Sequence, residues 1–323
     1  MVIRGAQAIR VIGNTPVSRA ATSVTRGRLR VLAHHGVPDP GAFERQLAEI
    51  AAQYRPVTGR DVVAAYRQGR PLPPRAVWVT FDDGHPEVVT DAMERLERWG
   101  IRATMFVCPA VIDTNEPFWW EVVRAAERLG VPPPPGAAGH RGPLEAALKA
   151  CPDARRRQVV AELGSAIESR DPEALYRPQL SSQQLRQWLE HGHEVGNHTW
   201  DHPLLDTCTP EQQRGQIRRA HQWLERATGS PPTLFAYPNG NWSAASEQEL
   251  NALDYQLGVG FDHRLARAPQ EHRLRVSRLR VDTDAPVDRF RAIISGVHPR
   301  LLTTRRQLLE RDAARKDPRM MPR

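Results

Sequence analysis

The segment that most constrains this chain is a short apolar run that ends in two adjacent carboxylates. Residues 77–81 read Val-Trp-Val-Thr-Phe, and Asp82, Asp83 and Gly84 follow directly. An apolar, β-branched run of this length after a proline-rich stretch predicts a buried strand. Loops at the ends of such strands carry functional side chains. Because Asp and Gly also favour turns, this segment alone predicts either a site or an ordinary turn.

A second segment favours a functional site. Residues 196–203 follow the apolar-flanked Val195 and contain His198 and His202 in a His-x-x-x-His pattern. Two imidazoles and a carboxylate can hold a catalytic metal ion and leave positions open for water and substrate. Together, the two segments predict a metal-dependent hydrolase.

The composition suits a folded core. The 323 residues allow one large domain or two smaller ones, and 40% of them are hydrophobic. The three cysteines, Cys108, Cys151 and Cys208, are far apart, which argues against a disulfide framework or a thiolate metal site. No apolar stretch approaches the roughly 18 residues of a membrane span, so no transmembrane segment is predicted.

The net charge of +8 comes from the two ends of the chain. Residues 1–30 carry six arginines and no acidic residue, and residues 301–323 carry seven basic and three acidic residues. The region between them is slightly acidic, which argues against a nucleic-acid-binding face. We expect residues 1–28 to be a basic, flexible extension and residues 301–323 to be a basic tail.

The N-terminal residues also bear on location. Arg10, Asn14, Pro16 and Arg19 interrupt every candidate for the apolar region of a secretory signal peptide. An acid-free composition with arginine and serine is also typical of transit peptides. The sequence predicts a cytoplasmic location, with peripheral attachment to a membrane or export as the alternatives.

Strands alternate with helices between residues 29 and 300. Strands are predicted at residues 29–33, 77–81, 103–108, 233–237, 257–261 and 278–281. Helices are predicted near residues 43–51, 87–99, 180–190, 209–228 and 287–295. This order predicts an α/β fold that is closed or nearly closed into a barrel, with its chemistry at the carboxyl ends of the strands. Residues from about 113 to 178, irregular at first and then helical within 143–176, are predicted to be an insertion.

Three motifs resemble those of one known family. They are Thr80-Phe81-Asp82-Asp83-Gly84, His198-Thr199-x-x-His202 and Phe235-Ala236-Tyr237-Pro238-x-Gly240, in this order. Each follows a predicted strand, and together they resemble the polysaccharide deacetylase family (carbohydrate esterase family 4) over roughly residues 29–298. The resemblance implies a distorted (β/α)7 barrel at residues 29–300 that contains the insertion.

The resemblance implies a divalent metal ion bound by Asp83, His198 and His202. Zinc is the default metal for such a donor set, and cobalt, nickel, manganese or iron also fit it. Asp82 is then the general base that takes a proton from water, because the metal keeps Asp83 ionised and leaves the neighbouring carboxylate free.

Further site residues follow from the same resemblance. The backbone N–H of Tyr237 would stabilise the oxyanion, and Tyr237 with Pro238 would form an apolar wall for the acetyl methyl group. Thr199 would form a hydrogen bond at the edge of the site. Trp119 and Trp120 would either stack on a sugar ring or pack in the core under the insertion, and Trp120 is the candidate for substrate contact.

One departure from the family pattern concerns the residue that orients the base. Many members have an arginine in the third motif, where this chain has Phe235 and Ala236. Arg278, on a predicted strand, is the candidate to hold Asp82 instead.

A second departure concerns the general acid, because no histidine clearly matches the last motif of the family. His35, His263 and His298 are the candidates. We favour His35 as a site residue, since it follows a predicted strand and matches a pocket histidine of related deacetylases. A lone histidine is nevertheless more often structural or exposed than catalytic.

These residues predict a hydrolase that removes N-acetyl groups from an N-acetylated poly- or oligosaccharide. Two alternatives stay open. Two histidines and one carboxylate also describe the triad of non-haem iron oxygenases, although the second aspartate and the α/β organisation disfavour it. A catalytically inactive carbohydrate-binding relative would share the fold without turnover.

Overall fold

Short parallel strands build the centre of the molecule, within the residues 15–137 and 143–299 that the computed structural model describes. Their order in the sheet is β7-β6-β5-β4-β3-β1-β8, with β2 beside β3. The strands are β1 (Arg30–His34), β2 (Arg55–Pro56), β3 (Ala76–Phe81), β4 (Ala103–Val107), β5 (Glu194–Asn197), β6 (Leu234–Ala236), β7 (Leu257–Val259) and β8 (Leu279–Arg280). The pairings between these strands are all parallel, as expected where crossover helices connect them.

The two edges of this sheet meet. β8 pairs with β1 at one edge, and just before β8 the residue Val276 forms a parallel bridge with Val259 of β7 at the other edge. Val276 N–H donates to Gly258 O, and Gly260 N–H donates to Val276 O, both at 2.9 Å. Because one segment joins both edges, the chain forms the distorted α/β barrel that the sequence predicted.

Helices cover the outside of the barrel and form the insertion. They are α2 (Pro16–Val24), α3 (Pro40–Gln53), α4 (Gly59–Gln68), α5 (Met93–Arg98), α6 (Trp119–Arg128), α7 (Leu144–Lys149), α8 (Asp153–Glu168), α9 (Ser182–Glu190), α10 (Pro210–Thr228), α11 (Ala244–Ala252) and α12 (Val287–Ile294). Phe43, Leu47 and Ile50 of α3 are buried at the spacing of one helix face, which is why this helix packs on the sheet. Ser181 caps α9, and Gly229 ends α10 in the left-handed conformation.

Some helices on the barrel differ from the sequence pattern. The helix predicted at residues 87–99 begins with a π-helical turn (Val88–Ala92) before α5. The sequence analysis did not predict α11, because its buried positions are mostly polar and form no apolar stripe: Ser246, Glu247 and Glu249 are buried beside Leu250.

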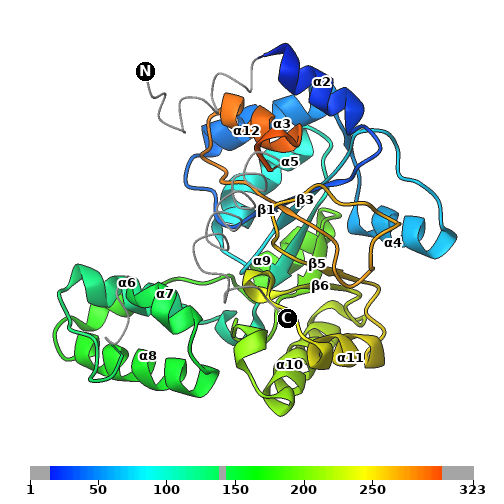
Figure 1. The fold of residues 1–323 in the computed structure, drawn as a ribbon. Helices are drawn as coiled ribbons and strands as arrows, with labels where there is room; N and C mark the ends of the chain where they lie inside the picture. Colours follow the sequence, from blue (N-terminus) through cyan, green and yellow to red (C-terminus); the bar gives the residue numbers. More distant parts are fainter. Residues whose placement is uncertain (1–14, 138–142, 300–323) are drawn as a thin grey trace, which may run out of the picture.

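The insertion forms a small helical lobe beside the barrel (Figure 1). Its helices α6, α7 and α8 share a hydrophobic core in which Val123 and Val159 are fully buried. The sequence predicted irregular structure before residue 143, whereas α6 is a regular helix. A polar contact starts this helix, since the carboxylate of Glu121 accepts a hydrogen bond from Phe118 N–H at 2.8 Å.

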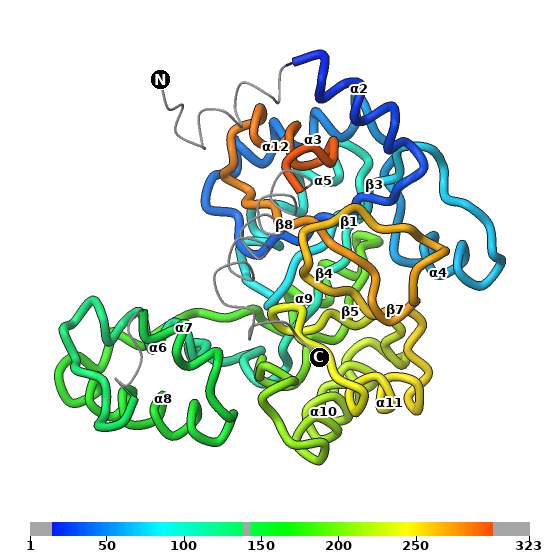
Figure 2. Tube along the Cα trace, in the orientation of Figure 1, coloured from blue at the N-terminus to red at the C-terminus, as the bar shows by residue number. Residues whose placement is uncertain are grey.

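Residues 15–28 differ from the expected flexible extension. They contain α2, which packs against α12 (Figure 2). The hydroxyl of Thr25 donates to Ser295 O at 3.2 Å, and the buried guanidinium of Arg30 donates to Thr25 O at 3.0 Å. These contacts make α2 part of the barrel domain.

The first 14 residues of the extension and the predicted basic tail at residues 301–323 lie outside the described ranges. None of the helices within those ranges combines the length and the apolar character that crossing a bilayer requires.

Candidate active site and metal-binding residues

Asp82 and Asp83 lie where β3 ends. Asp82 N–H donates to His34 O at 2.9 Å, which continues the pairing of β3 with β1 by one residue. Asp83 then has a φ of 72° and Gly84 a φ of 84°, so the chain turns sharply. Glycine suits the second position, because a Cβ there would lie 3.1 Å from the side chain of Val107. The turn places both carboxylates at the carboxyl end of the sheet.

His198 and His202 lie in the loop after β5. His198 N–H donates to Val107 O at 3.0 Å, and its Nδ1 lies 2.7 Å from Ala236 O. Because a carbonyl oxygen only accepts, Nδ1 carries the hydrogen, and Nε2 can bind a metal through its lone pair or, when protonated, donate to Asp83. A φ of 59° at His202 turns the second imidazole toward the same point.

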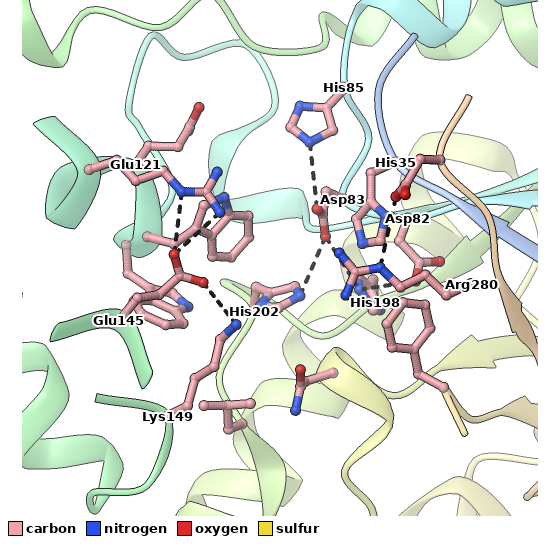
Figure 3. Close-up of a pocket in the computed structure, with 17 residues that line it drawn as sticks. His35, Asp82, Asp83, His85, Glu121, Glu145, Lys149, His198, His202 and Arg280 are labelled. Carbon is pink, nitrogen blue, oxygen red and sulfur yellow. Dashed lines mark hydrogen bonds and ion pairs between the residues drawn. The ribbon is translucent and has the colours of Figure 1, made fainter. Parts of the chain in front are cut away.

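Three potential ligand atoms face one another (Figure 3). Asp83 Oδ1 lies 3.4 Å from His198 Nε2 and 3.4 Å from His202 Nε2. This oxygen is buried and has no hydrogen-bond partner among the described residues. A buried carboxylate oxygen without a donor is costly, and a cation among the three atoms would satisfy it. The donor set therefore fits a divalent metal ion.

Burial and charge set the protonation of these groups. Burial lowers the pKa of His202 to about 3, so this imidazole is neutral at pH 7 and able to bind a metal. Burial raises the pKa of Asp83, but contacts with His198 and His202 outweigh it and hold the pKa well below its usual range. Burial lowers the pKa of His198, but Asp82 and Asp83 outweigh it and raise the pKa. The carboxylates thus favour a positive charge here, which a proton or a metal ion can supply.

Arg278 holds Asp82 by two hydrogen bonds. Its Nη1 and Nη2 each donate to one carboxylate oxygen at 2.7 Å, and both side chains are buried. Arg278 is itself fixed, because Nε donates to Gly260 O at 2.6 Å and Nη1 to Thr80 Oγ1 at 3.2 Å. Burial raises the pKa of Asp82, but Arg278 outweighs it, and the carboxylate stays ionised. The contact expected from the sequence is therefore present in the fold.

These groups open into a cavity of about 380 Å³ with walls from two parts of the chain. The barrel loops contribute His35, Asn239, Phe261, Arg280 and Asp282, and the insertion contributes Trp119, Trp120, Glu121, Arg124, Glu145 and Lys149 (Figure 3). Within the insertion wall, the carboxylate of Glu145 lies 2.8 Å from Lys149 Nζ and 3.3 Å from Arg124 Nη2. One wall is thus a charged cluster from a lobe outside the barrel.

Tyr237 does not line this cavity, contrary to expectation. Its N–H donates to Val259 O at 3.1 Å, which extends the pairing of β6 with β7, and its side chain is fully buried. Because that N–H is already used, it is not directed at an oxyanion. Thr199 and Pro238 are also absent from the lining residues, and Asn239 is the residue of this loop that lines the cavity.

Of the three candidate histidines, His35 lines the cavity. His263 and His298 instead bind each other, with Nε2 and Nδ1 2.9 Å apart, and neither lines the cavity. His85, which the sequence analysis did not single out, also lines it, and its Nε2 lies 3.5 Å from Asp83 Oδ2. Burial lowers the pKa of His85, but Asp83 outweighs it and raises the pKa. The sequence did hold one indication that His85 belongs to the site, because this residue directly follows the Asp-Asp-Gly turn.

Trp120 and Trp119 differ in their surroundings. The ring of Trp120 stacks on Phe118 with centroids 4.5 Å apart, and it meets the ring of His202 edge-on at 4.6 Å. Trp119 is buried in the core of the insertion, so the core alternative describes it better. Trp120 combines a cavity position with contact to a potential metal ligand.

Comparisons with known proteins agree with this geometry. The family model described as Polysaccharide deacetylase matches residues 69–258. The chain is 20% identical over 262 residues to the putative polysaccharide deacetylase YxkH of Bacillus subtilis (strain 168), covering 77% of this chain and 72% of that protein. It is 22% identical over 225 residues to the peptidoglycan-N-acetylglucosamine deacetylase PgdA of Listeria monocytogenes serotype 1/2a (strain 10403S), covering 69% of this chain and 34% of that protein.

Two solved structures share the fold. The deacetylase PplD of Streptococcus pyogenes, in complex with acetate, superposes with a TM-score of 0.58 at 17% identity, over 83% of this chain and 98% of that chain. IcaB from Ammonifex degensii superposes with a TM-score of 0.57 at 18% identity, over 84% of this chain and 98% of that chain. The family model covers more than half of the sequence, in agreement with the three motifs. This protein belongs to the polysaccharide deacetylase family and is a hydrolase.

Proposed function

We propose that this protein removes N-acetyl groups from an amino-sugar-containing poly- or oligosaccharide by metal-assisted hydrolysis. The observation that carries the proposal is the convergence of Asp83, His198 and His202 beside a second, separately held carboxylate. Membership of the polysaccharide deacetylase family supports the reaction class. One relative, PgdA, is named for its action on N-acetylglucosamine in peptidoglycan, which supports an N-acetylated glycan as substrate.

Asp83, His198 and His202 would hold the metal ion, most readily zinc, with cobalt, nickel, manganese or iron as alternatives. A divalent ion bound there lowers the pKa of a bound water molecule toward about 7 and polarises the acetyl carbonyl group. The chain prepares this site in advance, since Ala236 O fixes the tautomer of His198 and burial keeps His202 neutral.

Asp82 would act as the general base. Its Oδ2 lies 3.9 Å from His198 Nε2, so the carboxylate borders the space beside the proposed metal ligands. The two hydrogen bonds from Arg278 fix its orientation and keep it ionised. Each carboxylate oxygen can accept more than one hydrogen bond, so these contacts leave Asp82 able to take a proton from the attacking water.

His35 would deliver a proton to the leaving nitrogen. It lines the cavity on the barrel side, with its ring 5.9 Å from the ring of Phe261. Imidazole is suited to this exchange near neutral pH. The hydroxide part of water adds to the acetyl carbon, the carbon–nitrogen bond breaks, and acetate and the protonated sugar amine are the products.

The sugar would lie between the aromatic rings of Trp120 and Phe261, one from each wall of the cavity. Aromatic faces offer apolar surface to the C–H faces of a sugar ring. Leu204, which also lines the cavity, adds apolar surface suited to the acetyl methyl group.

The test is acetate release from a panel of N-acetylated glycans, including chitin-like oligomers, peptidoglycan fragments and surface polysaccharides. We expect metal-stripped protein to be inactive and zinc-restored protein to release acetate from at least one of them. If the protein binds zinc and no glycan loses acetate, deacetylation is the wrong activity. Glycan binding that is unaffected by metal removal, without turnover, would then identify an inactive carbohydrate-binding relative.

A further inference from the structure

The two histidines of the proposed metal site are supported by different parts of the chain. His198 is held by the barrel, through Val107 O and Ala236 O at the ends of β4 and β6. His202 has no comparable support from the barrel, because its buried Nδ1 has no hydrogen-bond partner among the described residues. A metal-binding histidine ordinarily donates its second N–H to such a partner, which fixes the ring. Something else must therefore fix the ring of His202.

The insertion binds the side chain of Asp201, just before His202, and the backbone carbonyl of His202 itself. Arg157 of α8 donates from Nη1 and Nη2 to the two carboxylate oxygens of Asp201, both at 2.8 Å. Arg156 Nη1 lies 3.4 Å from His202 O. Both arginines also bind the buried Asp153 at the start of α8, which holds the pair in place.

The insertion also packs around the imidazole and the residues that follow it. Trp120 and Phe118 meet the His202 ring at centroid distances of 4.6 Å and 6.2 Å. Leu204 is buried in the hydrophobic core of the insertion, together with residues of α6 and α8. The loop from residue 201 to 204 is thus anchored in the lobe, and Asp201 N–H also donates to Gln216 Oε1 of the barrel helix α10 at 3.2 Å.

This support matters because the loop has a strained backbone. Thr199 and His202 both have positive φ values, of 71° and 59°. Residues other than glycine keep this conformation only where the surrounding structure holds them.

We infer that the insertion positions His202 for metal binding, with Arg157, paired to Asp201, as the positioning residue that is most open to test. This inference rests on the proposed function and adds to it a second role for the insertion besides forming one wall of the cavity. An isolated surface ion pair contributes little, but this contact is bidentate and belongs to a network with a buried carboxylate. The insertion therefore sets the affinity for the metal as well as the shape of the cavity.

The test measures zinc affinity by competition with a chromophoric chelator. Arg157→Gln and Asp201→Asn should each weaken zinc binding about tenfold, the lower end of the effect of losing an outer-shell partner. The double variant should be no weaker than either single one, because all three lose the same contact. Arg157→Lys keeps the charge without the two-pronged geometry and should fall between the wild type and Arg157→Gln.

Arg155→Gln is the matched control. Arg155 precedes this pair on the same helix, but it is only half-buried and donates to Gln158 and to Pro135 O. The zinc affinity of Arg155→Gln should stay within about twofold of the wild type, since the described hydrogen bonds of Arg155 do not reach the loop at residues 201–204. The absorption spectrum of the cobalt-loaded proteins gives a second readout, since a misplaced His202 changes the ligand geometry in Arg157→Gln but not in Arg155→Gln.

Two outcomes would overturn the inference in different ways. If the wild type binds zinc and Arg157→Gln binds it as tightly as Arg155→Gln, with the same cobalt spectrum, the insertion does not position His202 and the proposed function still stands. If the wild type binds neither zinc nor cobalt, the proposed metal site fails and the inference fails with it. The melting temperature of the metal-free variants shows whether a loss of affinity follows from loss of folding.

Discussion

The barrel side and the insertion side of the candidate site are built in different ways. On the barrel side, Asp82 follows directly from the end of β3 and His198 from the end of β5. On the insertion side, His202 and the cavity wall depend on side-chain contacts with α6 and α8. Strand ladders fix positions closely, whereas a separate lobe can change without disturbing the barrel. Under the proposed function, the barrel would supply the reacting groups, and the insertion would supply substrate contact and position His202.

The largest effect is expected on the barrel side, at Arg278. Arg278→Met leaves the carboxylate of Asp82 buried without its partner, and we expect a loss of about 3–5 kcal/mol in the free energy of unfolding. Urea denaturation measures this loss. Arg280→Met, two residues further on and exposed at 65% of its side chain, is the control and should change stability by less than about 0.5 kcal/mol. If Arg278→Met and Arg280→Met lowered the free energy of unfolding equally, Arg278 would not be the residue that stabilises the buried carboxylate of Asp82.

Acid should destabilise the barrel through His34. This histidine is buried beneath the site, its Nδ1–H donates to Val281 O, and burial lowers its pKa to about 4. Since the unfolded chain binds the proton more readily, the neutral form contributes stability above about pH 6.5, and this stability is lost as the pH falls toward 4. The loss is on the order of 3 kcal/mol.

His34→Gln tests this pH dependence by urea denaturation of metal-free protein between pH 7.5 and 4.5. Its stability should fall less steeply with acid than that of the wild type. His272→Gln, at an exposed position, serves as the control and should keep the wild-type slope. The same slope in all three proteins would show that His34 does not titrate as described.

A smaller effect is expected on the insertion side, at the charged cluster. Lys149→Gln removes one partner of Glu145 from the cavity wall, where the contact is partly exposed. We expect KM to rise roughly threefold with kcat unchanged, because this group lies away from the reacting atoms and affects binding alone. Steady-state kinetics with the glycan that is deacetylated fastest measure both constants. A fall in kcat at unchanged KM would place the cluster in the reaction rather than in substrate contact.

The smallest effect is expected at Tyr237. Its hydroxyl is buried without a hydrogen-bond partner among the described residues, so Tyr237→Phe removes an unsatisfied group. We expect stability to stay the same or rise slightly and acetate release to stay within about twofold. A tenfold loss of activity would show that Tyr237 contributes to the site, as the sequence analysis predicted.

The sequence predicted the barrel side better than the insertion side, for a physical reason. Asp82, Asp83 and His198 follow apolar runs whose period marks strands, and strand ends share one edge of a parallel sheet. Arg278 was also identified, because it lies on a predicted strand, although it is 196 residues from Asp82. Tyr237 was misplaced because β6 ends one residue earlier than the apolar run, which leaves its N–H in the pairing with β7.

The insertion side could not be predicted in the same way. Its contacts with the His202 loop come from side chains such as Arg156, Arg157 and Trp120, which have no fixed relation to a strand end. Their sequence neighbours read as an amphipathic helix or as a loop, and nothing in their spacing indicates the partner across the lobe. Tertiary packing alone brings them to the site.

The central claim is that two adjacent carboxylates divide the work, Asp83 as metal ligand and Asp82 as base. The most direct test compares Asp82→Asn with Asp83→Asn for zinc content and acetate release, with circular dichroism to establish that both fold. We predict that Asp82→Asn keeps one equivalent of zinc while its turnover falls by about 100-fold or more, and that Asp83→Asn loses the zinc as well. The account would be contradicted if Asp82→Asn lost the metal as Asp83→Asn does, or if it kept the metal and the full rate.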